Sequence, residues 1–349
     1  MNLEQRINAF VQLGVFLADF REQKKDSPYS IYFKGFEEII TLSFIENGWF
    51  TRDNVLEALK GIELFCAESG LKELCSELEP VKNPQTIAVL MAGNIPAVGF
   101  HDFLCVILSG NRILLKLSSD DRVLIPFFVR FLVEIEPGLE SYILFASGKL
   151  QNFDAVIATG SNNTSRYFEY YFGKYPNIIR KNRNSIAVLN GTESSSDFQK
   201  LGKDIFTYFG LGCRNVSKVM VPSGYDFKLF FESILPFSSV IENKKYANNY
   251  DYNRAVYLLN KEDFLDNNFL ILKKDNSLSS PVSALFYEEY SDLIELTTTL
   301  KNLSGQIQVI VSGMDLQLPS LPFGMSQKPA INDFADNTNT MRFISELNT

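Results

Sequence analysis

Short apolar runs typical of β-strands alternate with helix-length segments between residues 84 and 190. The runs predict strands at Thr86–Met91, Ile113–Leu117, Tyr142–Phe145, Ala155–Ala158 and Ile186–Leu189. Helices are predicted at 97–108, 121–134 and 162–173. This alternation predicts an α/β fold in which helices cover a parallel sheet. We expect ligands at the carboxyl ends of such strands.

The rest of the chain divides around this block. Residues 1–79 are predicted to be helical, with periodic segments at 33–47 and 52–70. A second α/β block is predicted from helices at 197–209, 225–234 and 287–302 and strands at 218–221, 255–259 and 307–311. The polar stretch Glu242–Asn253 is expected to be an exposed loop, and the residues from Leu318 an irregular tail that returns over the body. The predicted parts are therefore a helical segment 1–79, a nucleotide-binding domain 80–190, a catalytic domain 191–317 and a tail 318–349.

Composition excludes several classes of protein. With 33 basic and 41 acidic residues, the net charge of −8 argues against nucleic acid as a partner. His101 is the only histidine, and the four cysteines lack metal-type spacing, so no metal site is expected. The sequence shows no signal peptide and no run approaching the ~18 apolar residues of a membrane span. We therefore expect a cytoplasmic protein with reduced cysteines.

Cys213 is the candidate nucleophile. It follows two glycines, Gly210 and Gly212, between a predicted helix and a predicted strand. Glycines allow a tight turn that leaves the thiol uncovered, and the neighbouring Arg214 would favour the reactive thiolate. Cys105, by contrast, lies inside an apolar segment that is typical of a core. Glycine-flanked cysteines also occur in ordinary turns, so this motif alone leaves both interpretations open.

Three strand ends carry further candidates. Asn94 lies in a Gly-Asn-Ile-Pro turn after the first strand, where a fixed amide could serve an oxyanion or simply make a local bond. Lys116 ends the second strand, where it could meet a ribose or phosphate or reach into solvent. Gly160 and Ser161 open a helix after the fourth strand, which suits either phosphate binding or a plain N-cap. A G-x-G-x-x-G fingerprint is absent from the sequence.

The order of these four motifs resembles the aldehyde dehydrogenase superfamily, and within it the acyl-CoA reductases of the LuxC type. The closing segments Leu321–Pro329 and Asp333–Thr340 also resemble that subfamily, so the likeness covers roughly residues 84–345. It implies an aldehyde-dehydrogenase-like fold with a Rossmann-type cofactor domain and a second α/β catalytic domain.

The resemblance also implies roles for individual residues. Cys213 would be the catalytic nucleophile, and Asn94 with the Cys213 backbone N–H would form the oxyanion hole. Lys116 would contact the adenosine ribose of the cofactor, and Gly160 and Ser161 would border it.

The sequence departs from the superfamily at three positions. The glutamate that activates water in hydrolytic members is replaced by Arg180 in our alignment. Ser119 stands three residues after Lys116, where members that prefer NAD have an acidic residue, which favours NADPH. The glutamate expected shortly before Ser280 to position the nicotinamide ribose is not evident. His101, about two helical turns after Asn94, is predicted to be structural rather than a proton donor.

These features predict the NADPH-dependent reduction of a fatty acyl-CoA thioester to an aldehyde through an acyl-Cys213 intermediate, with NADH as the less favoured cofactor. One alternative is an aldehyde or semialdehyde dehydrogenase that uses another acyl acceptor. The other is a catalytically silent relative that binds a nucleotide or a partner protein. Acyl-CoA is the expected partner. Whether the chain forms a homo-oligomer, and its acyl chain length, are left open by the sequence.

Overall fold

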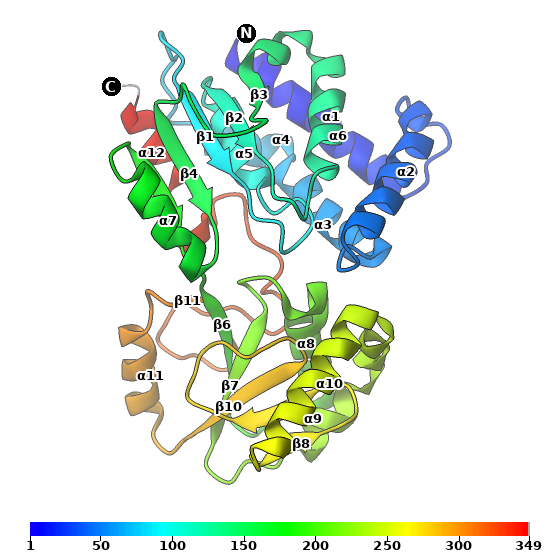
Figure 1. Cartoon of the computed structure of the whole chain (residues 1–349), viewed down its shortest axis with the longest axis vertical. Helices are drawn as coiled ribbons and strands as arrows, with labels where there is room; N and C mark the ends of the chain where they lie inside the picture. The colour runs from blue at the N-terminus through cyan, green and yellow to red at the C-terminus, as the bar shows by residue number, and fades with distance from the viewer. Residues whose placement is uncertain (348–349) are drawn as a thin grey trace. The chain divides into compact units, whose positions relative to one another are not determined.

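The computed structural model describes residues 1–347, which form two compact units (Figure 1). Unit 1 comprises Met1–Asn182 and the described residues from Ala330 onward, and unit 2 comprises Arg183–Pro329. Each unit is built on its own largely parallel sheet. Within residues 1–347, no helix is both long and apolar enough to cross a membrane.

The sheet of unit 1 has five parallel strands in the order β3-β2-β1-β4-β5. Their bounds are β1 Thr86–Leu90, β2 Arg112–Lys116, β3 Ile143–Phe145, β4 Ala155–Thr159 and β5 Asn177–Arg180. The central strand β1 pairs with β2 on one side and β4 on the other, with Val89 beside both Leu115 and Ile157. The strand order therefore reverses between β1 and β4, which is the switch point where open α/β sheets bind ligands.

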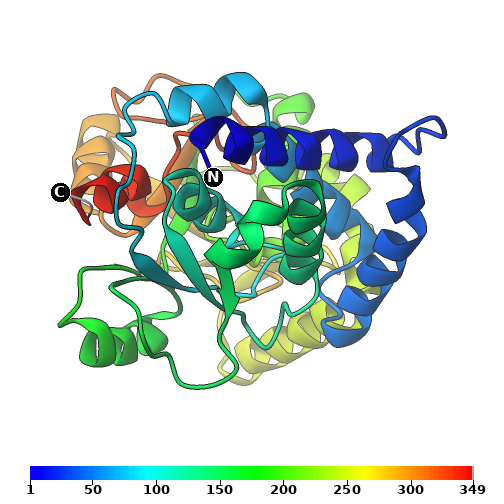
Figure 2. The ribbon, with the colours of Figure 1, turned by 90° about the horizontal axis from the view of Figure 1, so that it is seen from above.

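Helices cover both faces of this sheet. One face is covered by the helices α1 Leu3–Arg21, α2 Ser30–Glu46, α3 Arg52–Phe65, α4 Glu68–Leu74, α5 Phe100–Leu108 and α6 Leu124–Ile135, and the C-terminal helix joins the same core through Met341 and Ile344. Helix α1 extends across the unit (Figures 1 and 2). Stacked and edge-on phenylalanine rings fill their core, as where Phe16 stacks on Phe131. On the other face, α7 Asn162–Phe172 packs on Ala88, Val156 and Ala158. Two 3-10 turns, Pro137–Tyr142 and Ala335–Asn337, and the C-terminal helix α12 Thr340–Leu347 complete the unit.

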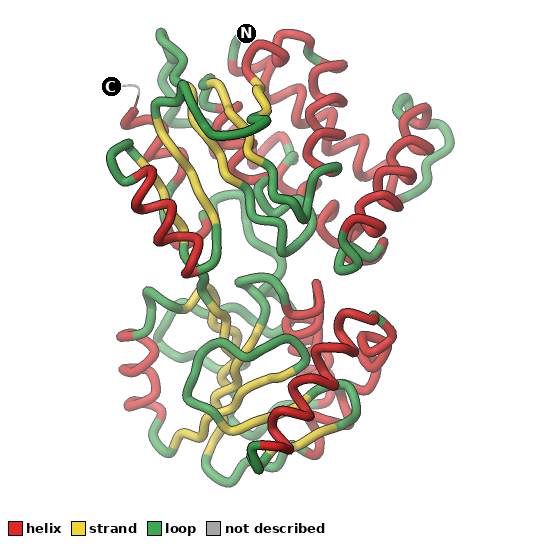
Figure 3. Tube along the Cα trace, in the orientation of Figure 1, coloured by secondary structure: helices red, strands yellow, loops and turns green. Residues whose placement is uncertain are grey.

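The sheet of unit 2 has six strands in the order β11-β6-β7-β10-β9-β8, of which only β8 is antiparallel to its neighbour (Figure 3). Their bounds are β6 Asn184–Val188, β7 Val216–Pro222, β8 Phe264–Asp266, β9 Ile271–Lys274, β10 Ala284–Tyr290 and β11 Ile307–Ser312. Along β6 the side chains alternate, so that Ala187 faces one core while Ile186 and Val188 face the other.

Each face of this second sheet has its own helices. Helices α8 Ser195–Phe206 and α9 Lys228–Ser233 cover one face, together with the 3-10 segments Thr207–Gly210 and Leu235–Glu242. Helix α10 Lys244–Leu259 packs through Tyr250 and Tyr257 on Ile271 and Ala284, whose side chains point away from those of Leu272 and Leu285 in the first core. Helix α11 Leu293–Asn302 covers the other face through Leu296 and Leu300. The Ser194 side chain and Asp197 form a capping box that fixes the start of α8.

Three predicted segments of unit 2 are wrong. The expected strand 255–259 and much of the expected loop Glu242–Asn253 belong to helix α10. Asn243 caps this helix, and Tyr246, Tyr250 and Tyr257 are buried on one face at helical spacing, a pattern that the surrounding polar residues concealed. The expected helix 287–302 divides into strand β10 and helix α11, because β10 pairs with β7 as far as Tyr290.

The observed unit boundaries also differ from those expected. Strand β6 pairs with β7 and β11, so unit 2 begins at Arg183 rather than after residue 190. The C-terminal tail is divided: Leu321 bridges to Val311 in unit 2, whereas residues from Ala330 join unit 1, where α12 contacts α5. Strands β5, β8, β9 and β10 and helix α12 were not predicted.

Candidate functional site

The five sequence-predicted site residues of unit 1 lie at one edge of its sheet. Asn94 is exposed in the loop between β1 and α5, and Lys116 is the last residue of β2. Ser119 is exposed three residues later, and Gly160 and Ser161 directly follow β4. Because the strands are parallel, their carboxyl ends share this edge, on both sides of the switch point.

The loop that carries Asn94 is fixed on the loop that carries Ser119. A Cβ atom at Gly93 would lie 2.5 Å from the Ser118 Oγ, so only glycine fits there. The buried Asp121 carboxylate accepts a hydrogen bond from the Ala97 N–H at 2.7 Å. Burial raises the pKa of Asp121 to about 6, although the N–H groups that it binds oppose the shift. These contacts hold the edge of the sheet in one arrangement.

Lys116 and Ser161 both make local contacts. The half-buried Lys116 donates from Nζ to the Gly148 carbonyl at 3.1 Å, which ties the end of β2 to the loop after β3. Ser161 is the N-cap of α7, because its Oγ accepts a hydrogen bond from the Thr164 N–H at 3.2 Å. The N-cap alternative for Ser161 is therefore realised. The N-terminus of α7 still directs its first N–H groups toward this edge.

Cys213 lies in unit 2, in the loop that leads into the amino end of β7. It is exposed, whereas the other three cysteines, Cys66, Cys75 and Cys105, are buried free thiols. Burial raises the pKa of each of these three, that of Cys75 to about 11. Among the four cysteines, Cys213 is the one whose thiol a substrate can reach.

The turn before Cys213 has a strained backbone. Tyr208 and Phe209 both adopt left-handed conformations, with φ of 54° and 56°, and Gly210 follows with φ of 79°. A left-handed residue other than glycine costs about 1–2 kcal/mol, so this turn persists only because its surroundings hold it. Of the two glycines expected to form the turn, only Gly210 uses the conformational freedom of glycine.

Two buried polar side chains hold the cysteine loop. The Asn215 Oδ1 accepts a hydrogen bond from the Gly212 N–H at 2.8 Å, and its Nδ2 donates to the Thr207 carbonyl at 2.8 Å. The fully buried Ser185, at the start of β6, donates from Oγ to the Cys213 carbonyl at 2.9 Å. The backbone on both sides of the thiol is thus tied to the body of unit 2.

The closing segment Leu321–Pro329 borders the same loop. The carboxylate of the buried Asp204, on α8, accepts hydrogen bonds from the Gly324 N–H at 2.6 Å and the Ser326 N–H at 3.0 Å. Burial raises the pKa of Asp204. Arg214, which follows Cys213, donates from Nε to the Ser326 carbonyl. This segment, which contributed to the family resemblance, therefore packs beside the candidate nucleophile.

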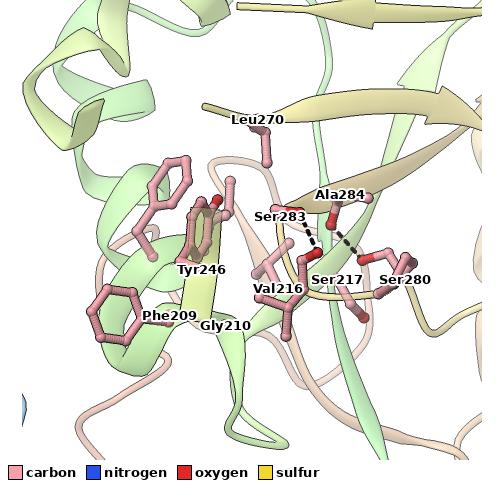
Figure 4. A pocket seen from close by; sticks show the side chains of 13 residues that line it. Phe209, Gly210, Val216, Ser217, Tyr246, Leu270, Ser280, Ser283 and Ala284 are labelled. Atoms are coloured by element: carbon pink, nitrogen blue, oxygen red, sulfur yellow. Dashed lines mark hydrogen bonds between the residues drawn. The ribbon is translucent and has the colours of Figure 1, made fainter. Parts of the chain in front are cut away.

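A small cavity lies behind the cysteine turn (Figure 4). The rings of Phe209 and Tyr246 line one side, and Ser217 and the 280–284 segment line the other. Ser280 donates to the Ala284 carbonyl at 2.7 Å. The cavity measures about 30 Å³, which is room for about one water molecule, whereas ligand pockets span roughly 300–1,000 Å³. In this form it does not hold an acyl chain.

Arg180 and His101 lie in the core of unit 1. The Arg180 guanidinium donates to both Asp102 carboxylate oxygens, at 2.5 and 2.9 Å, and to the Thr340 hydroxyl at 3.0 Å. Burial alone lowers the pKa of Arg180, but the Asp102 charge more than offsets it, so the pKa is raised. The His101 Nε2 lies 2.7 Å from the Ile331 carbonyl, and burial lowers its pKa. Both side chains have structural roles in this unit.

Within residues 1–347, no group of three or more His, Cys, Asp or Glu side chains could hold a metal ion.

Five candidate residues thus lie at the carboxyl edge of the unit 1 sheet, and the sixth, Cys213, lies before the amino end of β7 in unit 2. Three further residues that position them were missed by sequence reasoning: Asp121, Ser185 and Asn215. Asn215 could have been noticed in the sequence, because it is a polar residue only two positions after Cys213. Ser185 is 28 positions away from Cys213 in the chain, and only the pairing of β6 with β7 brings the two together.

Comparison with solved structures identifies the fold. Aldehyde dehydrogenase 21 from Physcomitrella patens, solved with the product succinate, has 13% identity and a TM-score of 0.63, over 99% of this chain and 84% of its own. Aldehyde dehydrogenase C from Pseudomonas syringae, solved with NAD+ and octanal, has 11% identity and a TM-score of 0.65, over 91% and 74%. An NADP-dependent enzyme of E. coli has 12% identity and a TM-score of 0.63, over 91% and 74%. The fold is that of the aldehyde dehydrogenases.

Part of the chain also matches the sequence model of a known family. Residues 78–229 match the sequence model of the family described as acyl-CoA reductase (LuxC), which confirms the resemblance that the motifs indicated. The matched range contains the six candidate residues Asn94, Lys116, Ser119, Gly160, Ser161 and Cys213. The family match and the fold together make the chain an oxidoreductase. Among the curated proteins compared, none matches it.

Proposed function

We propose that the protein reduces a fatty acyl-CoA thioester to an aldehyde through an acyl-Cys213 intermediate. The observation that carries the proposal is the exposed Cys213 thiol on a loop held by buried side chains, within the range that matches the acyl-CoA reductase family. The other three thiols are buried and are poor nucleophiles.

The proposed reaction has two stages on the same sulfur atom. The Cys213 thiolate attacks the thioester carbonyl, and the amide of Asn94 and the N–H of Cys213 stabilise the oxyanion. Collapse of this tetrahedral species releases the coenzyme A thiolate, which takes a proton, and leaves an acyl-enzyme. Reduction of the acyl carbon gives a thiohemiacetal on Cys213, which breaks its C–S bond to release the aldehyde and restore the thiolate.

A nicotinamide cofactor fits the edge of unit 1, and when bound it supplies the hydride. Three features there suit a dinucleotide. They are the switch point between β1 and β4, the close approach of Gly93 to Ser118, and the N-terminus of α7 after Gly160. Lys116 would contact the adenosine ribose, with Gly160 and Ser161 at the border. The relatives include an enzyme solved with NAD+ and another described as NADP-dependent, so the fold serves both cofactors. The exposed Ser119, three residues after Lys116, favours NADPH, because position 119 itself carries no carboxylate to repel a 2′-phosphate.

The direct test is to mix the protein with a long-chain acyl-CoA and NADPH, following cofactor absorbance and aldehyde formation. We expect one aldehyde and one free coenzyme A per NADPH consumed. Acyl phosphate in place of acyl-CoA tests the alternative acceptor, and turnover with acyl phosphate only would assign the protein to that class. A protein that binds NADPH but turns over neither substrate would be the silent relative. Four free thiols suit the reducing cytoplasm, where we place this activity.

Cofactor preference should change when Ser119 is replaced by glutamate. A carboxylate there would repel the 2′-phosphate of NADPH and accept a hydrogen bond from the 2′-hydroxyl of NADH. Such a contact is worth about 1–3 kcal/mol, so we expect the ratio of NADPH to NADH affinity to fall by about one to two decades. Titration of both cofactors measures this ratio. Ser141→Glu adds the same charge at an exposed position before β3, away from the carboxyl edge, and should leave the ratio unchanged. Equal ratios in wild type and Ser119→Glu would remove Ser119 from the cofactor site.

The protein should not oxidise aldehyde to free acid at a useful rate. The position aligned with the water-activating glutamate holds Arg180, whose guanidinium is engaged by Asp102. We expect aldehyde and NADP+ to give little NADPH until coenzyme A is added, and then to give acyl-CoA. Chromatography of the products distinguishes acid from thioester. Rapid acid formation without coenzyme A would contradict the proposed acyl transfer.

A further inference from the structure

The side chain of Asn215 brackets the strained turn that precedes Cys213. On one side of the turn its Nδ2 donates to the Thr207 carbonyl, and on the other its Oδ1 accepts from the Gly212 N–H, both at 2.8 Å. Between these two anchors lie the left-handed residues Tyr208 and Phe209. A single buried amide therefore spans the segment whose backbone would otherwise relax.

The same amide also ends helix α8. Its Nδ2 lies 3.1 Å from the Asp204 carbonyl and 3.4 Å from the Ile205 carbonyl, both in the last turn of that helix. Such carbonyls have no partner within a helix and need one from outside. Asn215 is only 2% exposed, so its bonds do not compete with water. The cysteine loop is thereby joined to the rigid end of a helix of 12 residues.

We propose that Asn215 is a positioning residue for the nucleophile: by fixing the strained turn, it holds Cys213 in the orientation that acyl transfer requires. The inference rests on the proposed function, since it concerns the step in which Cys213 attacks a thioester. Ser185 fixes the carbonyl of Cys213 from the other side, so a thiol on this loop has little freedom except rotation about its own bonds. Nucleophilic attack is sensitive to such placement, because a misplacement of about 1 Å can cost 10²-fold in rate.

The test distinguishes the orientation of the Cys213 thiol from its accessibility to a reagent. The first stage of the reaction is measured by mixing enzyme with acyl-CoA in the absence of NADPH and following the single-turnover release of coenzyme A with a thiol reagent after rapid quenching. Wild type and Asn215→Ala are compared well below the unfolding temperature of the variant. We expect coenzyme A release to slow by about 10- to 100-fold in Asn215→Ala. Alkylation of Cys213 by iodoacetamide, which needs no fixed orientation, should change by less than about threefold.

A second variant tests whether the oxygen or the nitrogen of the Asn215 amide is needed for coenzyme A release. Asn215→Asp keeps an oxygen that can accept from the Gly212 N–H, but it removes both N–H donors and places a carboxylate against the carbonyls of Thr207 and Asp204. We expect coenzyme A release in this variant to be at least as slow as in Asn215→Ala, because the anchor before the turn is lost.

Asn253→Ala is the matched control. Asn253 is another buried asparagine of unit 2, and its Nδ2 donates to the Val282 carbonyl at 2.9 Å. Both alanine variants should lower the midpoint of thermal unfolding, but only Asn215→Ala should slow coenzyme A release.

Comparison of the two alanine variants with wild type decides the proposal. A fall in acylation without a matching fall in alkylation, confined to Asn215, supports it. If Asn215→Ala slows acylation and alkylation equally, or if Asn253→Ala slows coenzyme A release as much, Asn215 only stabilises the fold and the proposal is overturned. A wild-type rate of acylation in Asn215→Ala would also overturn the proposal. If wild type itself releases no coenzyme A, the proposed function fails instead, and that outcome is distinct because it appears before any variant is compared.

Discussion

Replacing Cys213 with alanine should abolish aldehyde formation while leaving the fold and cofactor binding nearly intact. The thiol forms the bond to the acyl group, so no other described side chain can take its place in the proposed reaction. Loss of a catalytic nucleophile costs several orders of magnitude in kcat, and we expect at least about 10³-fold here. Because Cys213 is exposed, its truncation leaves no cavity in the core. Aldehyde production from acyl-CoA and NADPH, together with a thermal unfolding curve, measures both expectations.

The other cysteines provide controls for this experiment. Cys75→Ala and Cys105→Ala remove buried thiols of unit 1, so we expect lower stability but turnover within about twofold of wild type. Near-parental turnover by Cys213→Ala would show that another group is the nucleophile. Lost turnover together with an altered unfolding transition would mean that the variant is misfolded, and Cys213→Ser, which keeps the size of the side chain, would then be needed to decide the role of the thiol.

The fold was predictable where hydrophobic runs were long and uninterrupted. Strands β1 and β4 are buried on both faces and appear in the sequence as continuous apolar runs. Strand β2 is fully buried only at Ile113 and Leu115, but its Ile-Leu-Leu core was still visible. Helix α10 was missed because its buried face consists of three tyrosines and an asparagine, among lysines and asparagines that suggest a loop. Strand β9 has only four residues, and its place between β10 and β8 is set by pairing rather than by its own pattern.

The candidate residues could be named from the sequence, but the residues that hold them in place could not. The residues that would touch substrate or cofactor lie at strand ends, where short motifs such as Gly-Asn-Ile-Pro are visible in the sequence. The residues that hold them are single polar side chains within the core. Asp204 lies on α8, 120 positions before the Gly324 N–H that it binds. No local pattern indicates such a contact, because tertiary packing alone brings the two residues together.

Arg180→Met should destabilise the protein by about 3–5 kcal/mol, because it leaves the Asp102 charge buried without a partner. Both side chains are largely buried, at 5% and 11% exposed, and the guanidinium also binds the Thr340 hydroxyl at the start of α12. Urea unfolding followed by circular dichroism gives the free energy of unfolding. Arg52→Met is the matched control: it breaks an Arg–carboxylate pair with Glu37 in the same unit, but those side chains are 50% and 42% exposed, so the cost should be below about 1 kcal/mol.

The paired variant Arg180→Met with Asp102→Leu shows whether the charge causes the loss. Removing both partners takes away the unpaired carboxylate, so we expect the double variant to recover most of the stability lost in Arg180→Met. A cost under about 1 kcal/mol for Arg180→Met would contradict the buried ion pair. The result also bears on the chemistry of the site. If Arg180 anchors β5 to α5 and the C-terminal helix, a glutamate at this position would face Asp102, and like charges at hydrogen-bonding distance would destabilise unit 1. In the proposed alignment, the ion pair of Arg180 with Asp102 would then explain why no water-activating glutamate stands at this position, and the proposed acyl transfer to a thiol needs no such base.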